Sequence, residues 1–348
     1  MATAQRPAAA ASGAVPRRGL HHKLGFTTAT RFWLFVLFAT PMIYFSVRRL
    51  DYIDIDSAFC GGPNHAIQGE CYWYSQPGMD RMGMMLHLGA ILPAGILACV
   101  QFVPAVRRRF IALHMINGYI VVTLSVLGTI GVLMFTPHAM GGSRMTQAIS
   151  VLVCTMFLVA LFKAQLGIKR GRIDQHRAWM LRAWFYAGAI ITMRPILILV
   201  AWLSSKTPTY DAFPCKVVEY ILSGDQAELL ARFPSCARYV SGEDLEEWTV
   251  VKANFPVGDD VGSAAALRIG FAVGGALAIA IHAIGIEAYL HATAAENERL
   301  KKISVHKRAA TGRAKSQTGS KDTKASPSVP SPRSEKGQND QGGSAVLF

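Results

Sequence analysis

The sequence lacks the short motifs that mark most soluble enzymes. It contains no Gly-rich phosphate loop, no HExxH, no GxSxG and no CxxC. A phosphate loop holds nucleotide phosphates, HExxH binds zinc, and GxSxG exposes a nucleophilic serine. Nucleotide hydrolysis and the soluble types of zinc or serine chemistry are therefore not expected for this chain.

Charged residues are also scarce, at 17% of the chain, whereas 51% of the residues are hydrophobic. The apolar residues concentrate in six runs, at 32–47, 82–104, 112–136, 145–164, 177–203 and 264–290. About 20 helical residues cross the ~30 Å hydrocarbon layer of a bilayer, and every run except the first reaches that length. The sequence therefore predicts an all-α integral membrane protein, a bundle of six transmembrane helices.

The first thirty residues contain no continuous apolar stretch of the kind that precedes a signal-peptide cleavage site. We therefore expect residues 32–47 to be a retained first span that also targets the chain. The transmembrane domain then covers 31–290, between an N-terminal tail at 1–30 and a basic tail at 291–348. Beyond about residue 310 the tail is rich in Ser, Lys, Gly and Pro, which predicts disorder.

The net charge of +14 does not indicate a nucleic-acid partner, because the charge divides between the loops. With six spans, both termini and two loops lie on one side, where they carry 24 Lys and Arg residues. The other three loops carry nine, against 15 Asp and Glu residues. Since the basic side of a membrane protein faces the cytoplasm, we predict cytoplasmic termini, in an endomembrane or the plasma membrane, with the lipid bilayer as the surroundings.

Four of the six cysteines fall in the predicted non-cytoplasmic loops as two local pairs. Cys60 and Cys71 share the first of these loops, and Cys215 and Cys236 share the third, at 204–263. That side of the membrane is oxidising. We therefore predict the disulfides Cys60–Cys71 and Cys215–Cys236, with free thiols or a swapped pairing between the loops as the alternatives. The second disulfide would staple residues 204–263 into a small cap.

The fifth apolar run holds a cation deep inside the predicted bilayer. Arg194 lies within residues 177–203, and His176 lies at the opposite, basic end of the same helix. A cation in hydrocarbon is costly, so it usually faces protein, water or an anionic partner. Together with His87, these two residues are candidate catalytic groups of a membrane-embedded enzyme, where they would supply acid–base chemistry and anion binding in a cavity.

Five histidines in or beside the spans fall into two layers by depth. His114, His176 and His282 form the inner layer, and His87 and His138 form the outer one. Two bis-histidine haems stacked across a helical bundle would use this arrangement. We therefore expect His87, His114, His138 and His176 to bind haem b, with His114 and His176 as ligands of a haem iron. The alternative for each is an interfacial histidine that is hydrogen-bonded to a neighbouring helix.

The motif HRAWMLR at residues 176–182, with Arg194 downstream, resembles an uncharacterised family of integral membrane proteins, domain-of-unknown-function family 2306. His87 followed by Leu and Gly, and His114 followed by Gly118 and a tyrosine, agree with the family pattern. The resemblance covers roughly residues 82 to 203. It implies a multi-pass membrane protein and carries no established activity. The family usually has Arg directly after the third-span histidine, where this chain has Met115.

A more distant similarity links the Leu113-His114-x-x-x-Gly118 segment and the histidine layers to the ascorbate-reducible b-type cytochromes. That similarity implies six helices, two haems and electron transfer.

Three functions fit these observations. The first is a haem b-binding transmembrane electron-transfer protein, an oxidoreductase that takes electrons from a donor. The second is a membrane-embedded enzyme or accessory protein that acts on a lipophilic small molecule in a biosynthetic pathway. The third is a small-molecule transporter with Arg194 at its binding site. The sequence shows no internal repeat, which disfavours a transporter of the inverted-repeat type.

Overall fold

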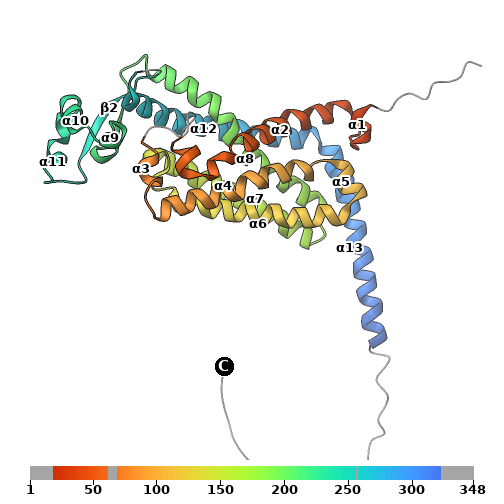
Figure 1. The fold of residues 1–348 in the computed structure, drawn as a ribbon. Coiled ribbons are helices and arrows are strands. Elements are labelled where there is room, and N and C mark those ends of the chain that lie inside the picture. The colour runs from red at the N-terminus through yellow and green to blue at the C-terminus, as the bar shows by residue number, and fades with distance from the viewer. Residues whose placement is uncertain (1–18, 62–68, 256–257, 323–348) are drawn as a thin grey trace, which may run out of the picture.

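The computed structural model describes residues 19–61, 69–255 and 258–322, with side chains as far as residue 310. In these ranges six helices are long and apolar enough to cross a membrane. They are α2 (Ala29–Arg48), α4 (Met79–Gln101), α6 (Ile111–Phe135), α7 (Arg144–Lys169), α8 (Ile173–Ser204) and α12 (Asp260–Ala292). The predicted bundle of six membrane-spanning helices is confirmed (Figure 1).

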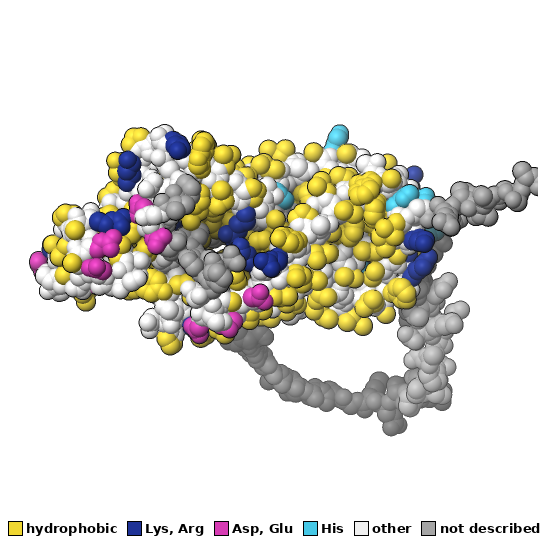
Figure 2. Space-filling view, turned by 45° about the horizontal axis from the view of Figure 1, so that its top comes forward, with side chains coloured by type: hydrophobic (Ala, Val, Ile, Leu, Met, Phe, Trp, Pro, Cys, Tyr) yellow, Lys and Arg dark blue, Asp and Glu magenta, His cyan; other side chains and the backbone are white. Residues whose placement is uncertain are grey.

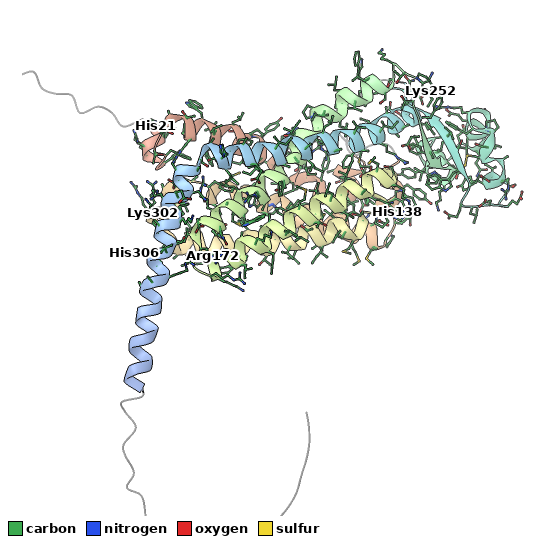
Figure 3. All side chains as sticks on the ribbon, turned by 180° about the vertical axis from the view of Figure 1, so that it is seen from behind. His21, His138, Arg172, Lys252, Lys302 and His306 are labelled. Carbon is green, nitrogen blue, oxygen red and sulfur yellow. A yellow bond between two sulfur atoms is a disulfide. The ribbon has the colours of Figure 1, made fainter. Side chains whose placement is uncertain are left out.

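The two ends of the bundle differ in chemistry. The short helices α1 (Leu20–Lys23) and α5 (Pro104–Arg109) lie at one end, where α13 (Ala294–Asp322) also leaves the bundle (Figure 1). His21, Arg172, Lys302 and His306 lie there, whereas His138 and Lys252 lie at the other end (Figure 3). We call these the basic end and the cap end. Between them hydrophobic side chains cover the flank, and acidic residues gather at the cap end (Figure 2).

Close backbone contacts between two pairs of helices form the frame of the bundle. A Cβ atom on Gly131 of α6 would lie 2.5 Å from the carbonyl oxygen of Gly83 and 2.6 Å from the backbone nitrogen of His87 in α4. A Cβ atom on Gly270 of α12 would lie 2.5 Å from the carbonyl oxygen of Leu197 in α8. Small residues let membrane helices approach this closely. The backbones that carry His87 and Arg194 are therefore held rigidly.

The middle of the bundle is filled by closely packed side chains from α4, α6, α7 and α8. This central cluster consists of Ala94, Ala98, Val121, Phe157, Ala160, Leu161, Ala183 and Trp184. Six of the eight side chains are at most 2% exposed. This part of the bundle is therefore a packed apolar core.

The segment between α8 and α12 forms the predicted cap. Strand β1 (Tyr210–Pro214) pairs antiparallel with β2 (Trp248–Lys252), with Tyr210 opposite Lys252. Helices α9 (Cys215–Ile221), α10 (Gln226–Arg232) and α11 (Ala237–Val240), and the turn η4 (Pro234–Cys236), lie between the strands. The core of the cap contains Phe213, Val217, Val218, Leu229 and Val251. The sequence did not predict the two-stranded sheet, because each strand is only five residues long.

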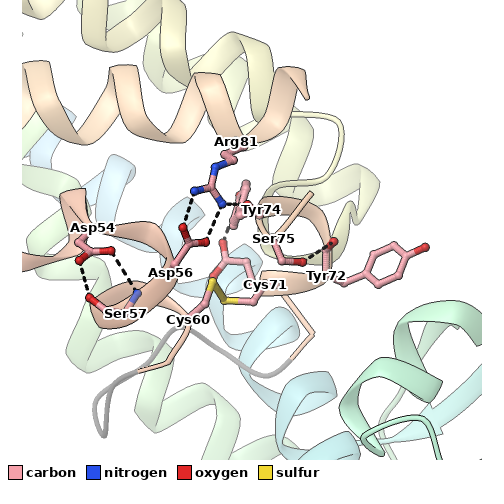
Figure 4. The surroundings of a disulfide bond; sticks show 10 residues. Asp54, Asp56, Ser57, Cys60, Cys71, Tyr72, Tyr74, Ser75 and Arg81 are labelled. Atoms are coloured by element: carbon pink, nitrogen blue, oxygen red, sulfur yellow. Dashed lines mark hydrogen bonds and ion pairs between the residues drawn. A yellow bond between two sulfur atoms is a disulfide. The ribbon is translucent and has the colours of Figure 1, made fainter. Parts of the chain in front are cut away.

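Both predicted disulfides are present, at Cys60–Cys71 and at Cys215–Cys236. The first joins Cys60, directly after the turns η1 (Leu50–Ile53) and η2 (Ile55–Phe59), to the start of helix α3 (Cys71–Tyr74) (Figure 4). Arg81 of α4 donates hydrogen bonds of 2.8 and 2.7 Å to Asp56 in η2. The loop between the first two spans is therefore fastened to both α3 and α4.

The C-terminal tail begins as a helix, where the sequence predicts disorder from about residue 310. Helix α13 runs from Ala294 to Asp322, and its first part is rich in Ala, Lys, Arg and Glu, which favour helices. Ser304 anchors it, because its hydroxyl donates to Asp174 at 2.8 Å and accepts from the backbone N–H of Ile173 at 2.9 Å. The predicted disorder at 323–348 and the tail at 1–18 lie outside the described residues.

Candidate functional site

Two guanidinium groups meet at one aromatic ring near the cap end. The Cζ atoms of Arg194 in α8 and of Arg49, directly after α2, lie 5.9 and 5.8 Å from the ring centroid of Phe45. The guanidinium of Arg49 also lies 4.4 Å from the ring centroid of Tyr52. The Nε atom of Arg194 is buried and has no hydrogen-bond partner among the described residues. The two cations therefore share one aromatic ring at the edge of an apolar bundle.

Among the described residues, Glu70 in the loop before α3 is the carboxyl group that acts on Arg194. The hydroxyl of Tyr74 donates to Glu70 Oε1 at 3.5 Å, and Tyr74 is fully buried. Burial raises the pKa of Glu70 to about 7, although Arg194, the backbone N–H of Met140 and the Tyr74 hydroxyl oppose the rise. A carboxyl group with that pKa exchanges its proton near neutrality. We call Phe45, Arg49, Glu70, Tyr74 and Arg194 the cap-end site.

His87 lies one aromatic ring away from the cap-end site. Its ring centroid is 5.8 Å from that of Phe135, which is 6.1 Å from that of Tyr74. His87 Nδ1 lies 2.9 Å from the carbonyl oxygen of Gly128. Because a carbonyl only accepts, Nδ1 carries the hydrogen, and Nε2 holds the lone pair in the neutral ring.

His138 follows α6 at the cap end and has a different environment. Its Nδ1 lies 3.0 Å from Asp80 Oδ1, and its ring stacks on Trp73 with 3.7 Å between the centroids. Asp80 precedes His87 by two helical turns, roughly 10 Å along α4. The structure therefore places the two outer histidines of the haem prediction at different depths.

Two of the three inner histidines, His114 and His176, lie together at the basic end. His114 in the first turn of α6 interacts electrostatically with His176 of α8 and with Arg107 of α5. Nδ1 of His176 donates to the carbonyl oxygen of Ala164 at 3.0 Å, whereas Nδ1 of His114 is buried without a partner among the described residues. The two predicted iron ligands are therefore brought together. No group of three or more His, Cys, Asp and Glu side chains suited to a metal ion occurs in the described part of the chain.

His282, the third member of the predicted inner layer, uses both ring nitrogens to join α12 to α8. Nδ1 donates to the carbonyl oxygen of Phe185 at 2.6 Å, and Nε2 accepts from the Thr192 hydroxyl at 2.8 Å. This is the interfacial role considered as the alternative for each histidine. His282 has no ring nitrogen left for a cofactor in this arrangement.

The HRAWMLR motif connects α8 to two neighbouring helices, α7 and α12. His176 binds the backbone of α7, and Trp179 lies under the ammonium of Lys163, 4.3 Å from its ring centroid. Arg182 donates hydrogen bonds of 2.6 and 2.8 Å to Glu287 of α12. Arg177 donates to Thr293, directly after α12, at 3.5 Å. Most residues of this motif therefore position helices.

Sequence reasoning missed Arg49, Glu70 and Tyr74 of the cap-end site. Arg49 follows the first span and looks like an ordinary boundary arginine, and the other two lie in or beside a loop. The nearby disulfide Cys60–Cys71 was the one available signal, because it holds this loop in a fixed position. Of the three predicted catalytic candidates, Arg194 and His87 lie toward the cap end, and His176 lies at the basic end.

Comparison with curated proteins and with solved structures found no match. A family profile described as "Predicted membrane protein (DUF2306)" matches residues 84–220. The matched segment contains Arg194 and the histidines at 87, 114, 138 and 176, but not Arg49 or Glu70. The family that the HRAWMLR motif indicated is thereby confirmed. Residues 84–220 of this chain are thus similar to the DUF2306 family of predicted membrane proteins.

Proposed function

We propose that this membrane protein binds an anionic, lipophilic compound at the cap-end site and exchanges a proton with it. The observation that carries the proposal is the meeting of Arg49 and Arg194 at the ring of Phe45. In the part of the chain that the structure describes, Glu70 is the only carboxyl group among the charged groups that act on Arg194. Two cations against one carboxyl leave a positive surplus in an apolar setting, which an anionic partner stabilises.

The chemistry of the site fits a carboxylate on a long apolar body. A guanidinium binds a carboxylate through two parallel hydrogen bonds, and Arg194 Nε is a buried donor that still lacks an acceptor. Apolar side chains on the same two helices face outward, since Tyr44 of α2 is 68% exposed and Leu199 of α8 is 54% exposed. A compound dissolved in the bilayer would therefore approach from the flank, with its charged group toward the arginines.

Glu70 supplies the proton-exchanging group. Its pKa of about 7, raised by burial, is matched to general acid–base chemistry near neutral pH. His87, with its Nε2 lone pair and its position beyond Phe135, is a second base at slightly greater depth. This arrangement supports an enzyme or accessory protein that acts on a lipophilic metabolite.

Binding of a fluorescent long-chain fatty acid to the purified protein in lipid nanodiscs tests the proposal. Arg194→Gln and Arg49→Gln should each weaken binding about tenfold or more, because a hydrogen bond to a charged group contributes ~1.5–3 kcal/mol. Arg48→Gln is the matched control, since Arg48 is the exposed neighbour of Arg49, and it should change little. Unchanged affinity in Arg194→Gln would refute the assignment. Uptake of the probe into vesicles would assign the site to transport.

A second candidate, haem b in an electron-transfer protein, is supported by the hydrogen bonds of His87 and His176. Each donates Nδ1–H to a backbone carbonyl, which leaves Nε2 for a metal, as in metal-bound imidazoles. His114, with its buried and unpartnered Nδ1, lies near His176, so this pair fits one haem at the basic end. The outer pair fits less well, because His87 and His138 lie at different depths. Bound haem would supply one-electron chemistry.

The visible spectrum of the purified protein separates the two candidates. A reducible haem band at about one haem per chain, lost in His114→Ala and His176→Ala, would establish the second candidate. The next step would then be to identify the electron donor of the protein. A spectrum without that band would remove it and leave the cap-end proposal intact.

We also infer that the basic end faces the cytoplasm. The excess of Lys and Arg at that end and the two disulfides at the cap end support the same orientation. Glycosylation acceptor sites inserted at Gly242 in the cap and after residue 322 would test it, with modification expected only in the cap.

A further inference from the structure

A second polar cluster lies at the basic end, and the proposed function does not use it. Four buried polar atoms there have no hydrogen-bond partner among the described residues: Gln101 Oε1, His114 Nδ1, Arg177 Nη1 and Asn297 Oδ1. A buried polar atom without a partner costs about 1–3 kcal/mol, so such atoms are rare in folded proteins. Four of them at one end of the bundle indicate a bound group that satisfies them.

Hydrogen bonds connect these residues into two groups, Gln101 with His114, and Arg177 with Asn297 through Thr293. Gln101, at the end of α4, donates through Nε2 to the backbone carbonyl of His114 at 2.9 Å. Since that carbonyl can only accept, the amide of Gln101 is fixed with Oε1 as its free acceptor. Arg177 donates to the Thr293 hydroxyl, and Asn297 donates its backbone N–H to the carbonyl of the same threonine at 3.3 Å.

Arg107 of α5 completes the cluster. It interacts electrostatically with His114, with His176 and with Arg177, and so it lies among residues of α6 and α8. We call Gln101, Arg107, His114, His176, Arg177 and Asn297 the basic-end site. Five different elements of the chain contribute to it, namely α4, α5, α6, α8 and α13.

The basic-end site carries surplus positive charge. The nearby carboxylate of Glu296 accepts hydrogen bonds of 2.7 and 3.0 Å from Arg299 and lies 4.0 Å from Arg31, so it is already paired. Burial lowers the pKa of Arg107, and neighbouring arginines lower it further against the opposing effect of Glu296. An anion bound at the site would offset the electrostatic repulsion between these like charges.

We propose that the basic-end site binds a phosphate monoester group, with Arg107 and Arg177 on its anionic oxygens and its hydroxyl donating to the amide oxygen of Gln101 or Asn297. The unpartnered atoms of the basic-end site include hydrogen-bond donors and acceptors, so the ligand must both accept and donate hydrogen bonds. A carboxylate only accepts hydrogen bonds and would leave the two amide oxygens without partners. A phosphate monoester has a second pKa near 6, so it retains a hydroxyl in part of the population near neutrality.

The phosphate monoester has two sources at this position. Phosphatidic acid would present it from the bilayer, because the site lies at the end of the membrane-spanning helices. A water-soluble phosphorylated molecule would present the same group from the aqueous side. The chemistry of recognition is shared, and the experiment separates the sources.

Lipid binding to the full chain in phosphatidylcholine nanodiscs is the first arm. Phosphatidic acid should bind about tenfold more tightly than phosphatidylglycerol, an anionic phosphodiester that lacks the hydroxyl on phosphorus. Arg107→Gln and Arg177→Gln should remove about tenfold in affinity, and Gln101→Leu should remove the preference between the two lipids. Arg109→Gln, two residues further along the same short helix, is the matched control and should bind as the unmodified protein does.

Inorganic phosphate binding to the detergent-solubilised protein, measured by calorimetry, is the second arm. Phosphate binding that Arg177→Gln abolishes, without a preference for phosphatidic acid, assigns a soluble source and upholds the proposal. Arg107 lies in a short helix at the rim, so Arg107→Gln remains informative even where Arg177→Gln disturbs the fold. Equal binding of both lipids together with no phosphate binding would overturn the proposal. A haem band that depends on His114 would overturn it as well, because a porphyrin would then hold these groups.

Discussion

Replacement of Glu70 by glutamine should remove a pH dependence that originates at the cap-end site. Burial raises the pKa of this carboxyl group from 4.5 to about 7. Because the folded-state pKa is the higher one, the folded protein holds the proton more tightly than the unfolded chain does over that interval. The stability contribution is therefore fully present below the unfolded pKa and is lost as the pH rises through about 7.

The size of the effect follows from the two pKa values. The difference between 4.5 and about 7 corresponds to about 3 kcal/mol in the free energy of unfolding, since one pKa unit is ~1.36 kcal/mol. Glutamine is similar in size and cannot ionise. Glu70→Gln should therefore exceed the unmodified protein in stability by up to about 3 kcal/mol near pH 8, with a smaller difference near pH 4.

Ligand binding should report the same proton. An ionised Glu70 neutralises one of the two guanidinium charges, so the affinity for an anionic fatty-acid probe should fall about tenfold between roughly pH 6 and pH 8. Glu70→Gln should show no such fall. Asp51→Asn is the control, because Asp51 is an exposed carboxyl group directly after Leu50 in the same loop.

Thermal melting in detergent and titration of the probe, each over a pH series, measure the two effects. The reasoning is refuted when Glu70→Gln retains the pH slope of the unmodified protein in both measurements. If Glu70→Gln loses the pH dependence of the melting temperature but keeps that of probe affinity, Glu70 is the titrating group for stability but does not act on the ligand.

Three further substitutions test how the frame and cap are held together. Arg268→Ala removes a guanidinium that is 4% exposed and whose Nε lies 3.0 Å from the carboxylate of Asp211 in β1. The free energy of unfolding should fall by about 3–5 kcal/mol, and the cap should become sensitive to protease. Cys215→Ser opens a disulfide with a sequence separation of 21 and should cost the cap about 3 kcal/mol, measured by melting with and without reductant. Gly131→Ala forces a Cβ to 2.5 Å from a carbonyl oxygen of α4, so it should lower the free energy of unfolding by about 1–3 kcal/mol and the melting temperature with it. Gly89→Ala is the control, because its Cβ meets nothing within 4 Å and the melting temperature should not change.

The spans and the disulfides could be predicted from the sequence because each depends on local information. Apolar length alone decides whether a helix can cross a bilayer, and the pairs Cys60–Cys71 and Cys215–Cys236 follow from the loop that each cysteine occupies. The same depth argument brought His114 and His176 to one end, and the structure places them near each other.

Counting residues from a span end gives only an approximate depth and does not determine which way a side chain faces, and both limits affected the prediction of the site. His87 and His138 were grouped by depth, but the interaction of His138 with Asp80 and Trp73 separates them. The partner of Arg194 could not be found for a related reason. Arg49 and Glu70 lie outside the fifth span, and their approach to it depends on how α2 and the first loop pack against α8.

The helix-connecting role of HRAWMLR changes how losses of function in this protein should be interpreted. A random mutagenesis screen would identify residues 176–182 readily, because substitution of His176, of Arg177 or of Arg182 removes a contact of α8 with its neighbours. Those variants would disappear from the membrane through degradation before their chemistry could be assayed. Assays normalised to the amount of folded protein would instead single out substitutions near Phe45, which leave the helical scaffold standing.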